Sequence, residues 1–147
     1  MINEFRKIKR EDKEIIFSMM KTCYSSDAVY TNGSDEIFSK DIENCLNENP
    51  YLDGYVFEND GVIIGYAMLA KSFSTEFGKP CIWIEDLYLL QEYRGQHIVP
   101  NFIEHIKKKY CDCVLRLEVE KENKHACYVY KKLGFEELPY CEMKFEN

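Results

Sequence analysis

Residues 81–110 read CIWIEDLYLLQEYRGQHIVPNFIEHIKKKY, and this stretch decides the fold class. Its first ten residues are mostly aromatic, β-branched or long apolar residues, which is typical of a strand in the middle of a sheet. A polar turn around Gly95 follows the strand. From residue 100 to residue 110, apolar side chains recur on one helical face and charged side chains on the other, and proline suits a first helical turn. The stretch therefore predicts a central strand, a turn and a helix.

Downstream of this stretch, strand and helix patterns continue to alternate. Residues 114–119 are β-rich, residues 123–133 predict a short helix that Gly134 ends, and residues 135–145 predict a last strand. Such alternation predicts a mixed sheet with parallel strands, beside which ligands bind at the carboxyl ends of the strands. We therefore expect function to lie after Leu90.

Upstream, the pattern predicts a strand, two amphipathic helices and a hairpin. The strand covers residues 5–8, the first helix covers residues 9–24, and Ser34 caps a second helix that ends before Pro50. The hairpin joins residues 55–58 to residues 62–71 through an Asn-Asp-Gly turn. With no repeat or linker in the sequence, we expect one α/β domain over residues 1–147.

Charge and composition narrow the classes of partner. The formal net charge is -7, from 26 acidic and 19 basic residues, which disfavours nucleic acids and acidic membranes. The sequence has neither a membrane-length apolar stretch nor a secretory signal, so we expect a cytoplasmic protein. Its seven cysteines lack the paired spacing of a zinc site, which favours reduced, buried thiols and no metal.

Two segments carry a resemblance to a known family. Residues 85–89 (EDLYL) followed by residues 92–96 (EYRGQ) are similar to the central strand and the [QR]xxGx[GA] turn of GNAT acetyltransferases, and the match is partial. Residues 123–135 (NKHACYVYKKLGF) match the later NxxAxxxYxxLGF pattern of that family at every named position. The resemblance implies a mixed, mostly antiparallel sheet of six to seven strands with about four helices, splayed where acetyl-CoA binds as cosubstrate.

The resemblance also implies which residues bind acetyl-CoA. Leu87 and Leu89 are at the positions that pair with the pantetheine arm, and Asn123 is at a position that contacts the cofactor and caps the following helix. The diphosphate is expected at a turn and helix start whose N–H groups attract an anion. The residues of this turn are Arg94, Gly95, Gln96, His97, Ile98, Val99 and Pro100.

The turn departs from the family pattern at two positions. His97 and Val99 occupy positions where the family has small residues, and Pro100 lacks an N–H. Side chains there crowd the diphosphate in one reading, whereas the remaining amides still bind it in the other. A degenerate loop that binds no cofactor is therefore the alternative.

Acetyl transfer needs a neutral amine and a proton for the departing thiolate. By resemblance, Tyr130 is the general acid, and the alternative is a half-buried helix tyrosine with a satisfied hydroxyl. Glu85 is similar to the carboxylate that acts as base through water in the diamine and polyamine acetyltransferases. The alternative role of Glu85 is a structural hydrogen bond. Acceptor binding is expected at a further set of acidic and aromatic residues, unless these simply form a solvated face: Asp27, Tyr30, Asp35 and Glu36.

The function predicted from the sequence is acetyl transfer from acetyl-CoA to a primary amine of a small cationic acceptor in a ternary complex. A protein or peptide acetyltransferase is the alternative within enzymes, and a catalytically silent binding module is the alternative outside them. The expected partner is a small-molecule amine, and a homodimer is left open.

Overall fold

A computed structural model of the chain describes residues 3–27 and 29–147. In this part of the chain one sheet contains five strands, which are β1 (Asn3–Lys7), β2 (Leu52–Asn59), β3 (Val62–Ser74), β4 (Lys79–Leu89) and β5 (Val114–Leu117). The α-helices are α1 (Lys13–Tyr24), α2 (Asp35–Leu46), α3 (Ile98–Lys109) and α4 (Lys124–Lys132). A short 3-10 turn, η1 (Arg10–Asp12), precedes α1, and another, η2 (Gln91–Tyr93), follows β4.

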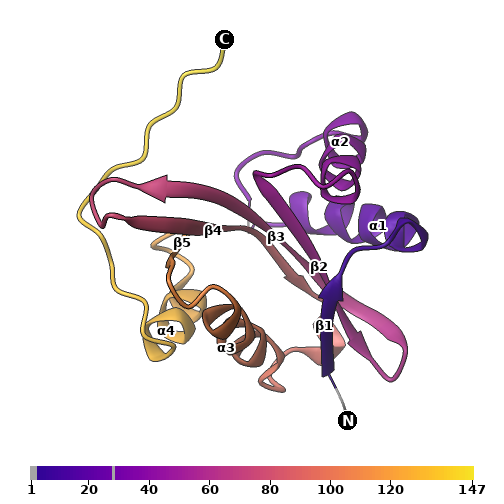
Figure 1. Cartoon of the computed structure of the whole chain (residues 1–147). Helices are drawn as coiled ribbons and strands as arrows, with labels where there is room; N and C mark the ends of the chain where they lie inside the picture. Colours follow the sequence, from indigo (N-terminus) through magenta and orange to yellow (C-terminus); the bar gives the residue numbers. More distant parts are fainter. Residues whose placement is uncertain (1–2, 28) are drawn as a thin grey trace.

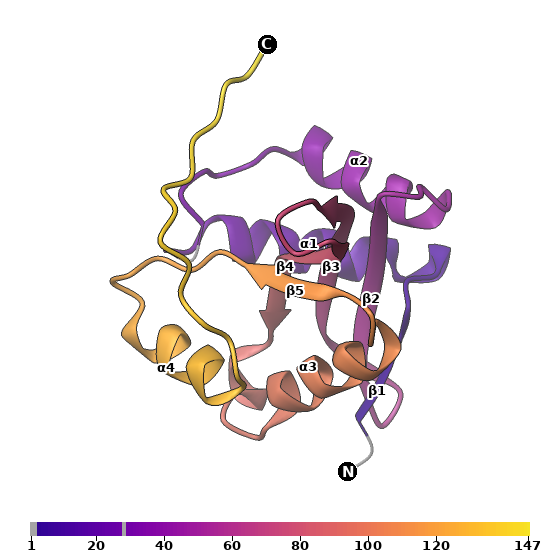
Figure 2. The ribbon, with the colours of Figure 1, turned by 60° about the vertical axis from the view of Figure 1, so that its left-hand side comes forward.

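The strands lie in sequence order, β1-β2-β3-β4-β5. The first four strands pair antiparallel and β5 pairs parallel with β4. Helices α1 and α2 cover one face of the sheet, and α3 and α4 lie on the other (Figures 1 and 2). Each face has its own apolar cluster, one around Phe102 of α3 and the other around Met20 of α1. The carboxyl half of β4 is therefore positioned between two cores.

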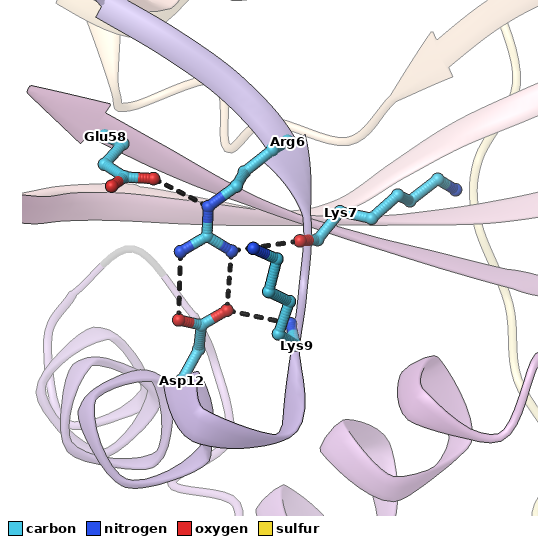
Figure 3. A network of polar contacts seen from close by, with 5 residues as sticks. All are labelled: Arg6, Lys7, Lys9, Asp12 and Glu58. Atoms are coloured by element: carbon cyan, nitrogen blue, oxygen red, sulfur yellow. Dashed lines mark hydrogen bonds and ion pairs between the residues drawn. The ribbon is translucent and has the colours of Figure 1, made fainter. Parts of the chain in front are cut away.

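An ion-pair network ties the first strand to the first helix (Figure 3). The guanidinium of Arg6 donates to both carboxylate oxygens of Asp12, at 2.8 and 3.1 Å, and to Glu58 of β2 at 2.6 Å. Asp12 also accepts from the main-chain N–H of Lys9 at 2.8 Å. Since the Asp12 side chain is 4% exposed, this paired carboxylate is screened little by solvent.

Three expectations from the sequence are corrected. Residues 135–145 form no strand, so the described sheet has five strands rather than six to seven. A strand requires a hydrogen-bonded neighbour, and residues 136–147 make no hydrogen bond between main-chain groups to any described residue. Helix α3 begins at Ile98, two residues before Pro100, because the proline falls within the first turn, where its missing N–H has no partner to lose. Cys111 and Cys141 are exposed rather than buried.

None of the helices within residues 3–27 and 29–147 combines the length and the apolar character that crossing a bilayer requires.

Candidate functional site

The parallel strands β4 and β5 pair over only part of their length. Cys81 to Ile84 of β4 lie opposite Val114 to Leu117 of β5, and β5 ends at that point. Strand β4 continues for five more residues, Glu85 to Leu89, beside β3 alone. Among the described residues, the main-chain groups of this part of β4 that point away from β3 therefore have no strand to pair with. The edge of β4 is thus open at the place where the resemblance implies a splayed strand pair.

Glu85 lies at a β-bulge, at the point where the two strands separate. Met68 of β3 is opposite Asp86 and the next residue, Leu69, is opposite Ile84, so Glu85 has no partner on β3. A bulge changes which face the following side chains occupy. As a result, Ile84 and Leu87 both pack on the α3 side of the sheet although three positions separate them. Asp86 is thereby directed to the opposite face, toward α1.

Asp86 is a buried carboxylate between two tyrosines. Its oxygens accept hydrogen bonds from Tyr24 of α1 at 2.8 Å and from Tyr66 of β3 at 2.9 Å. Burial raises the pKa of Asp86, and the two hydroxyl donors offset only part of this effect. The negative charge of Asp86, after burial itself, also raises the pKa of the half-buried Asp41 on α2 to about 6. Asp86 thus anchors the bulge to α1 and adds negative charge there.

Glu85 belongs to a group of carboxylates at the end of β5. Desolvation, followed by the charges of Asp86 and Glu142, raises the pKa of Glu85, although its side chain is exposed to solvent. Glu118 directly follows β5. Desolvation, a hydrogen bond with Glu142 and the charges of Glu142 and Glu85 raise the pKa of Glu118 to about 7. Raised pKa values favour proton exchange near neutral pH.

The turn that follows β4 presents free N–H groups. Over residues 95–99, five consecutive main-chain N–H groups have no hydrogen-bond acceptor among the described residues. Gly95 and His97 both have left-handed backbone conformations, with φ values of 77° and 61°. His97 is followed by Ile98, the first helical residue, and such a step from a left-handed to a right-handed residue turns successive N–H groups toward one concave side. The twelve-residue helix α3 places its positive end there. The arrangement suits an anion such as a diphosphate.

The side chains of this turn leave its amides accessible. Val99 packs against the core rather than toward the turn, and His97 is exposed. Histidine is among the residues that adopt a positive φ more readily than most. Arg94 points back to β4, where its Nε donates to the carbonyl of Leu89 at 3.0 Å and its guanidinium lies 5.9 Å from the Tyr88 ring centre. In the structure, the Arg94 side chain therefore contacts β4 at Leu89 rather than the amides of the turn.

Helix α4, which contains Tyr130 and follows Asn123, lies on the same side of the sheet as α3 (Figure 2). Asn123 caps α4, since its side-chain oxygen accepts from the N–H of Ala126 at 3.2 Å, which confirms the predicted cap. Lys107 of α3 donates to the carbonyl of Leu133 at 2.7 Å and holds the end of α4 against α3. Burial raises the pKa of Tyr130, and its hydroxyl has no hydrogen-bond partner in the described part of the chain.

Comparison with known proteins gives the family. Residues 14–135 match the profile of the Acetyltransferase (GNAT) family, which is most of the chain. The chain belongs to the GNAT family of acetyltransferases. Thialysine N-epsilon-acetyltransferase of Bos taurus is 37% identical over 83 residues, 54% of this chain and 48% of the relative. Its Mus musculus counterpart is 31% identical over 109 residues, 66% of this chain and 63% of the relative. The matched region thus spans between about half and two thirds of these relatives.

Solved structures have the same GNAT fold. A possible acetyltransferase from Clostridium difficile 630 superposes with a TM-score of 0.81 at 22% identity, covering 100% of this chain and 99% of that one. The aminoglycoside acetyltransferase AAC(6')-Iy, in complex with a CoA bisubstrate analogue, superposes with a TM-score of 0.80 at 18% identity. This superposition covers 100% of this chain and 99% of that one. Both likenesses concern the fold.

The acidic and aromatic residues predicted to bind the acceptor do not form a single cluster in this GNAT chain. Asp35 pairs with Lys21 at 3.7 Å and, with it, lines a hollow of about 410 Å³ between α1 and α2. Asp27 and Glu36 are exposed, and Tyr30 lies beside Lys144 instead. A second hollow, of about 520 Å³, is lined by residues 137–141 and Lys121. Neither hollow contains Glu85 or the turn after β4.

Sequence reasoning missed the carboxylates that surround Glu85. Asp86 follows it directly, and the signal was an acidic pair inside an apolar strand, where two carboxylates need partners. Glu118 and Glu142 come from segments 33 and 57 positions further along the chain, and no local pattern connects them to β4. Only the folded chain brings them near Glu85.

Proposed function

We propose that this chain transfers an acetyl group from acetyl-CoA to a primary amine of a small cationic acceptor, by direct attack in a ternary complex. The observation that carries the proposal is the row of five N–H groups at residues 95–99 that have no acceptor among the described residues and closely follow the open part of β4. Each feature suits one half of CoA: the edge of β4 that lacks a neighbouring strand suits one, and the anion-binding start of α3 suits the other. The amide-rich pantetheine arm pairs with the strand, and the diphosphate accepts from the turn.

Leu87 and Leu89 supply the main-chain edge in this arrangement, and residues 95–99 supply the donors. Asn123 caps α4, the helix that contains Tyr130 and lies on the same side of the sheet as α3. Arg94 contributes through Leu89, because its hydrogen bond to that carbonyl braces the end of the strand. The chain therefore orients the thioester between the carboxyl end of β4 and α4.

The proton-transfer roles follow from the environments of two residues. The pKa of Tyr130 is raised by burial, so its hydroxyl keeps its proton at neutral pH and can donate it to the sulfur when the carbon–sulfur bond breaks. The pKa of Glu85 is raised as well, which brings this carboxylate closer to the pH at which a base is most effective. Glu85 accepts, through water, the proton that the amine loses as the carbon–nitrogen bond forms.

A cationic acceptor fits the charges around the site. Glu85 and Glu118 place two carboxyl groups at the end of β5, and an ammonium group that approaches them favours their ionised forms and gains from their negative charge before it loses a proton. The relatives are named for N-epsilon acetylation of thialysine, whose acceptor is a primary amine. A small molecule with a primary amine and a second charge is the acceptor class that we propose.

Thermal unfolding with CoA tests the binding half of the proposal. CoA at a hundredfold over its dissociation constant should stabilise the fold by about 2.7 kcal/mol, equivalent to a rise in melting temperature of roughly 5–10 °C. Pantetheine, which lacks the diphosphate, is the matched control and should produce a much smaller rise. No shift with millimolar CoA would contradict the proposal.

An acceptor screen tests the catalytic half. Free thiol is measured as acetyl-CoA is consumed in the presence of diamines, basic amino acids and peptides. Thiol release with small cationic amines supports the proposal, and release with peptides alone supports a protein or peptide acetyltransferase. CoA binding without any release supports the silent binding module.

A further inference from the structure

Arg116 of β5 is half-buried, and its side chain makes no hydrogen bond or ion pair with any described residue. The other arginines of the chain, Arg6, Arg10 and Arg94, donate to carboxylates or to a main-chain carbonyl. The chain has 26 acidic residues, yet none that the structure describes lies within ion-pair distance of Arg116. Hydrogen bonds between charged groups are among the strongest in proteins, so the donors of Arg116 suit an anionic ligand.

The contact that Arg116 does make holds its guanidinium and leaves the N–H donors available. Trp83 of β4 lies directly opposite Arg116 in the parallel ladder, and the guanidinium carbon lies over the Trp83 ring, 4.5 Å from its centre. An aromatic ring attracts the guanidinium through its charge, and indole offers no conventional acceptor to the N–H groups. Trp83 therefore positions Arg116 for a planar partner with two acceptor oxygens, such as a carboxylate.

Trp83 and Arg116 lie on the face of the sheet that bears α1 and α2. The next pair in the parallel ladder, Ile84 and Leu117, packs in the apolar cluster around α3. Successive side chains of a strand point to opposite faces, so Trp83 and Arg116 are directed to the other face, where Figures 1 and 2 show α1 and α2. Both side chains are only half-buried there, so a ligand can reach them.

The alternation returns to this face at Glu85 and Glu118, which directly follow Ile84 and Leu117. Beyond desolvation and Glu142, the charge of Glu85 raises the pKa of Glu118, so these two carboxyl groups lie close together. Two strand positions separate Arg116 from Glu118, which is about 7 Å between Cα atoms. An amine and a carboxylate joined by about five carbon atoms, with bonds of ~1.5 Å, are separated by a similar length.

The position of Arg116 does not suit the phosphates of CoA. The N–H groups proposed to bind the diphosphate, those of residues 95–99, follow the carboxyl end of β4 and lead into α3. Trp83 lies in the first half of β4, and it holds Arg116 on the face opposite to α3. An anionic group of the acceptor is therefore the better match for Arg116.

We propose that Arg116 binds the carboxylate of a basic amino acid whose side-chain amine reaches Glu85 and is acetylated there. The inference rests on the acetyl transfer proposed above, with the same bond changes and proton transfers, and it names the acceptor class. The carboxylate accepts two parallel hydrogen bonds from the guanidinium. A diamine of the same length places an ammonium group or nothing beside Arg116, so the site favours the amino acid by attraction and disfavours the diamine by repulsion.

Two matched pairs of acceptors test the carboxylate site: lysine with cadaverine, and ornithine with putrescine. The members of each pair differ only in a carboxylate. Measured by thiol release, kcat/KM should be at least about tenfold higher for the amino acid in one or both pairs. Arg116→Gln should lower kcat/KM for that amino acid about 10- to 100-fold and leave the diamine unchanged or faster. Arg10→Gln removes the same charge from an arginine whose side chain is 66% exposed, and this control should keep the preference.

Calorimetric titration in the presence of CoA separates this inference from the transfer reaction. The amino acid should bind at least about tenfold more tightly than its diamine, and Arg116→Gln should abolish the difference. Such binding without thiol release supports the carboxylate site and contradicts the proposed function instead. Thiol release with diamines and no preference in either assay overturns the inference and leaves acetyl transfer intact. A preference that survives Arg116→Gln, or an equal loss for both members of each pair, also overturns the inference.

Discussion

Removal of one oxygen atom, in Tyr130→Phe, separates the chemical role of this side chain from its packing. The hydroxyl has no hydrogen-bond partner in the described residues, and the ring packs edge-on against Phe135 at 5.7 Å, a contact that phenylalanine keeps. The free energy of unfolding should therefore change by no more than about 0.5 kcal/mol. If the hydroxyl protonates the departing thiolate, turnover should fall by about 10²- to 10⁴-fold.

The assay is thiol release at saturating acetyl-CoA and acceptor, with the CoA-induced melting shift measured on the same preparations. We expect kcat and kcat/KM to fall together while the CoA shift stays within experimental error, because the lost interaction forms only in the transition state. Tyr128→Phe is the control, since Tyr128 lies on the same helix and is 58% exposed. Turnover of Tyr130→Phe within twofold of the unmodified enzyme would refute the general-acid role.

Two further changes test the base and the fold. Glu85→Gln keeps the shape of the side chain and should lower kcat/KM for the acceptor about 10- to 10³-fold, without changing the CoA shift. Because a base must be deprotonated, activity should fall as pH drops through the raised pKa of Glu85, and an unchanged acidic limb in the variant would contradict this role. Asp12→Asn should lower the free energy of unfolding at pH 7 by about 2–3 kcal/mol in urea titrations, since Arg6 loses its buried partner. Burial opposes ionisation of Asp12, but the Arg6 and Lys9 hydrogen bonds outweigh it and lower the pKa of Asp12. The stabilisation by the Arg6–Asp12 pair is fully present above the ordinary aspartate pKa of about 3.9, and it is lost as pH falls through the lowered pKa of Asp12 in the folded protein. A difference between the proteins that is as large at pH 3 as at pH 7 would contradict this account.

Local patterns predicted the features that depend on neighbours in sequence. Asn123 caps α4 because its side chain needs only an N–H three positions away. The Asp60-Gly61 turn joins β2 to β3 as expected, because both residues have a positive φ. The apolar spacing of α3 placed that helix correctly to within two residues. Each of these features depends on interactions within a few residues.

Local sequence patterns were not sufficient to predict whether the C-terminal residues form a strand. Residues 141–146 have the alternation of a strand, and that alternation is a property of the sequence alone. Whether they form one depends on a neighbouring edge, which local spacing does not specify. The alternation therefore predicted a strand that does not form in the structure.

By itself, the sequence determined the helices, the hairpin, the turn after β4 and the GNAT resemblance. Periodicity and motif spacing are properties of residues that are close together in sequence. Tertiary structure alone decided the environment of Glu85. The register between β3 and β4 leaves Glu85 unpaired in a bulge and directs Asp86 to Tyr24, 62 positions earlier in the chain. The end of β5 opens the edge of β4 and leaves Glu118 beside Glu85. Register and strand length result from packing between distant segments, so residues far apart in sequence acquire their shared electrostatics only when the chain folds.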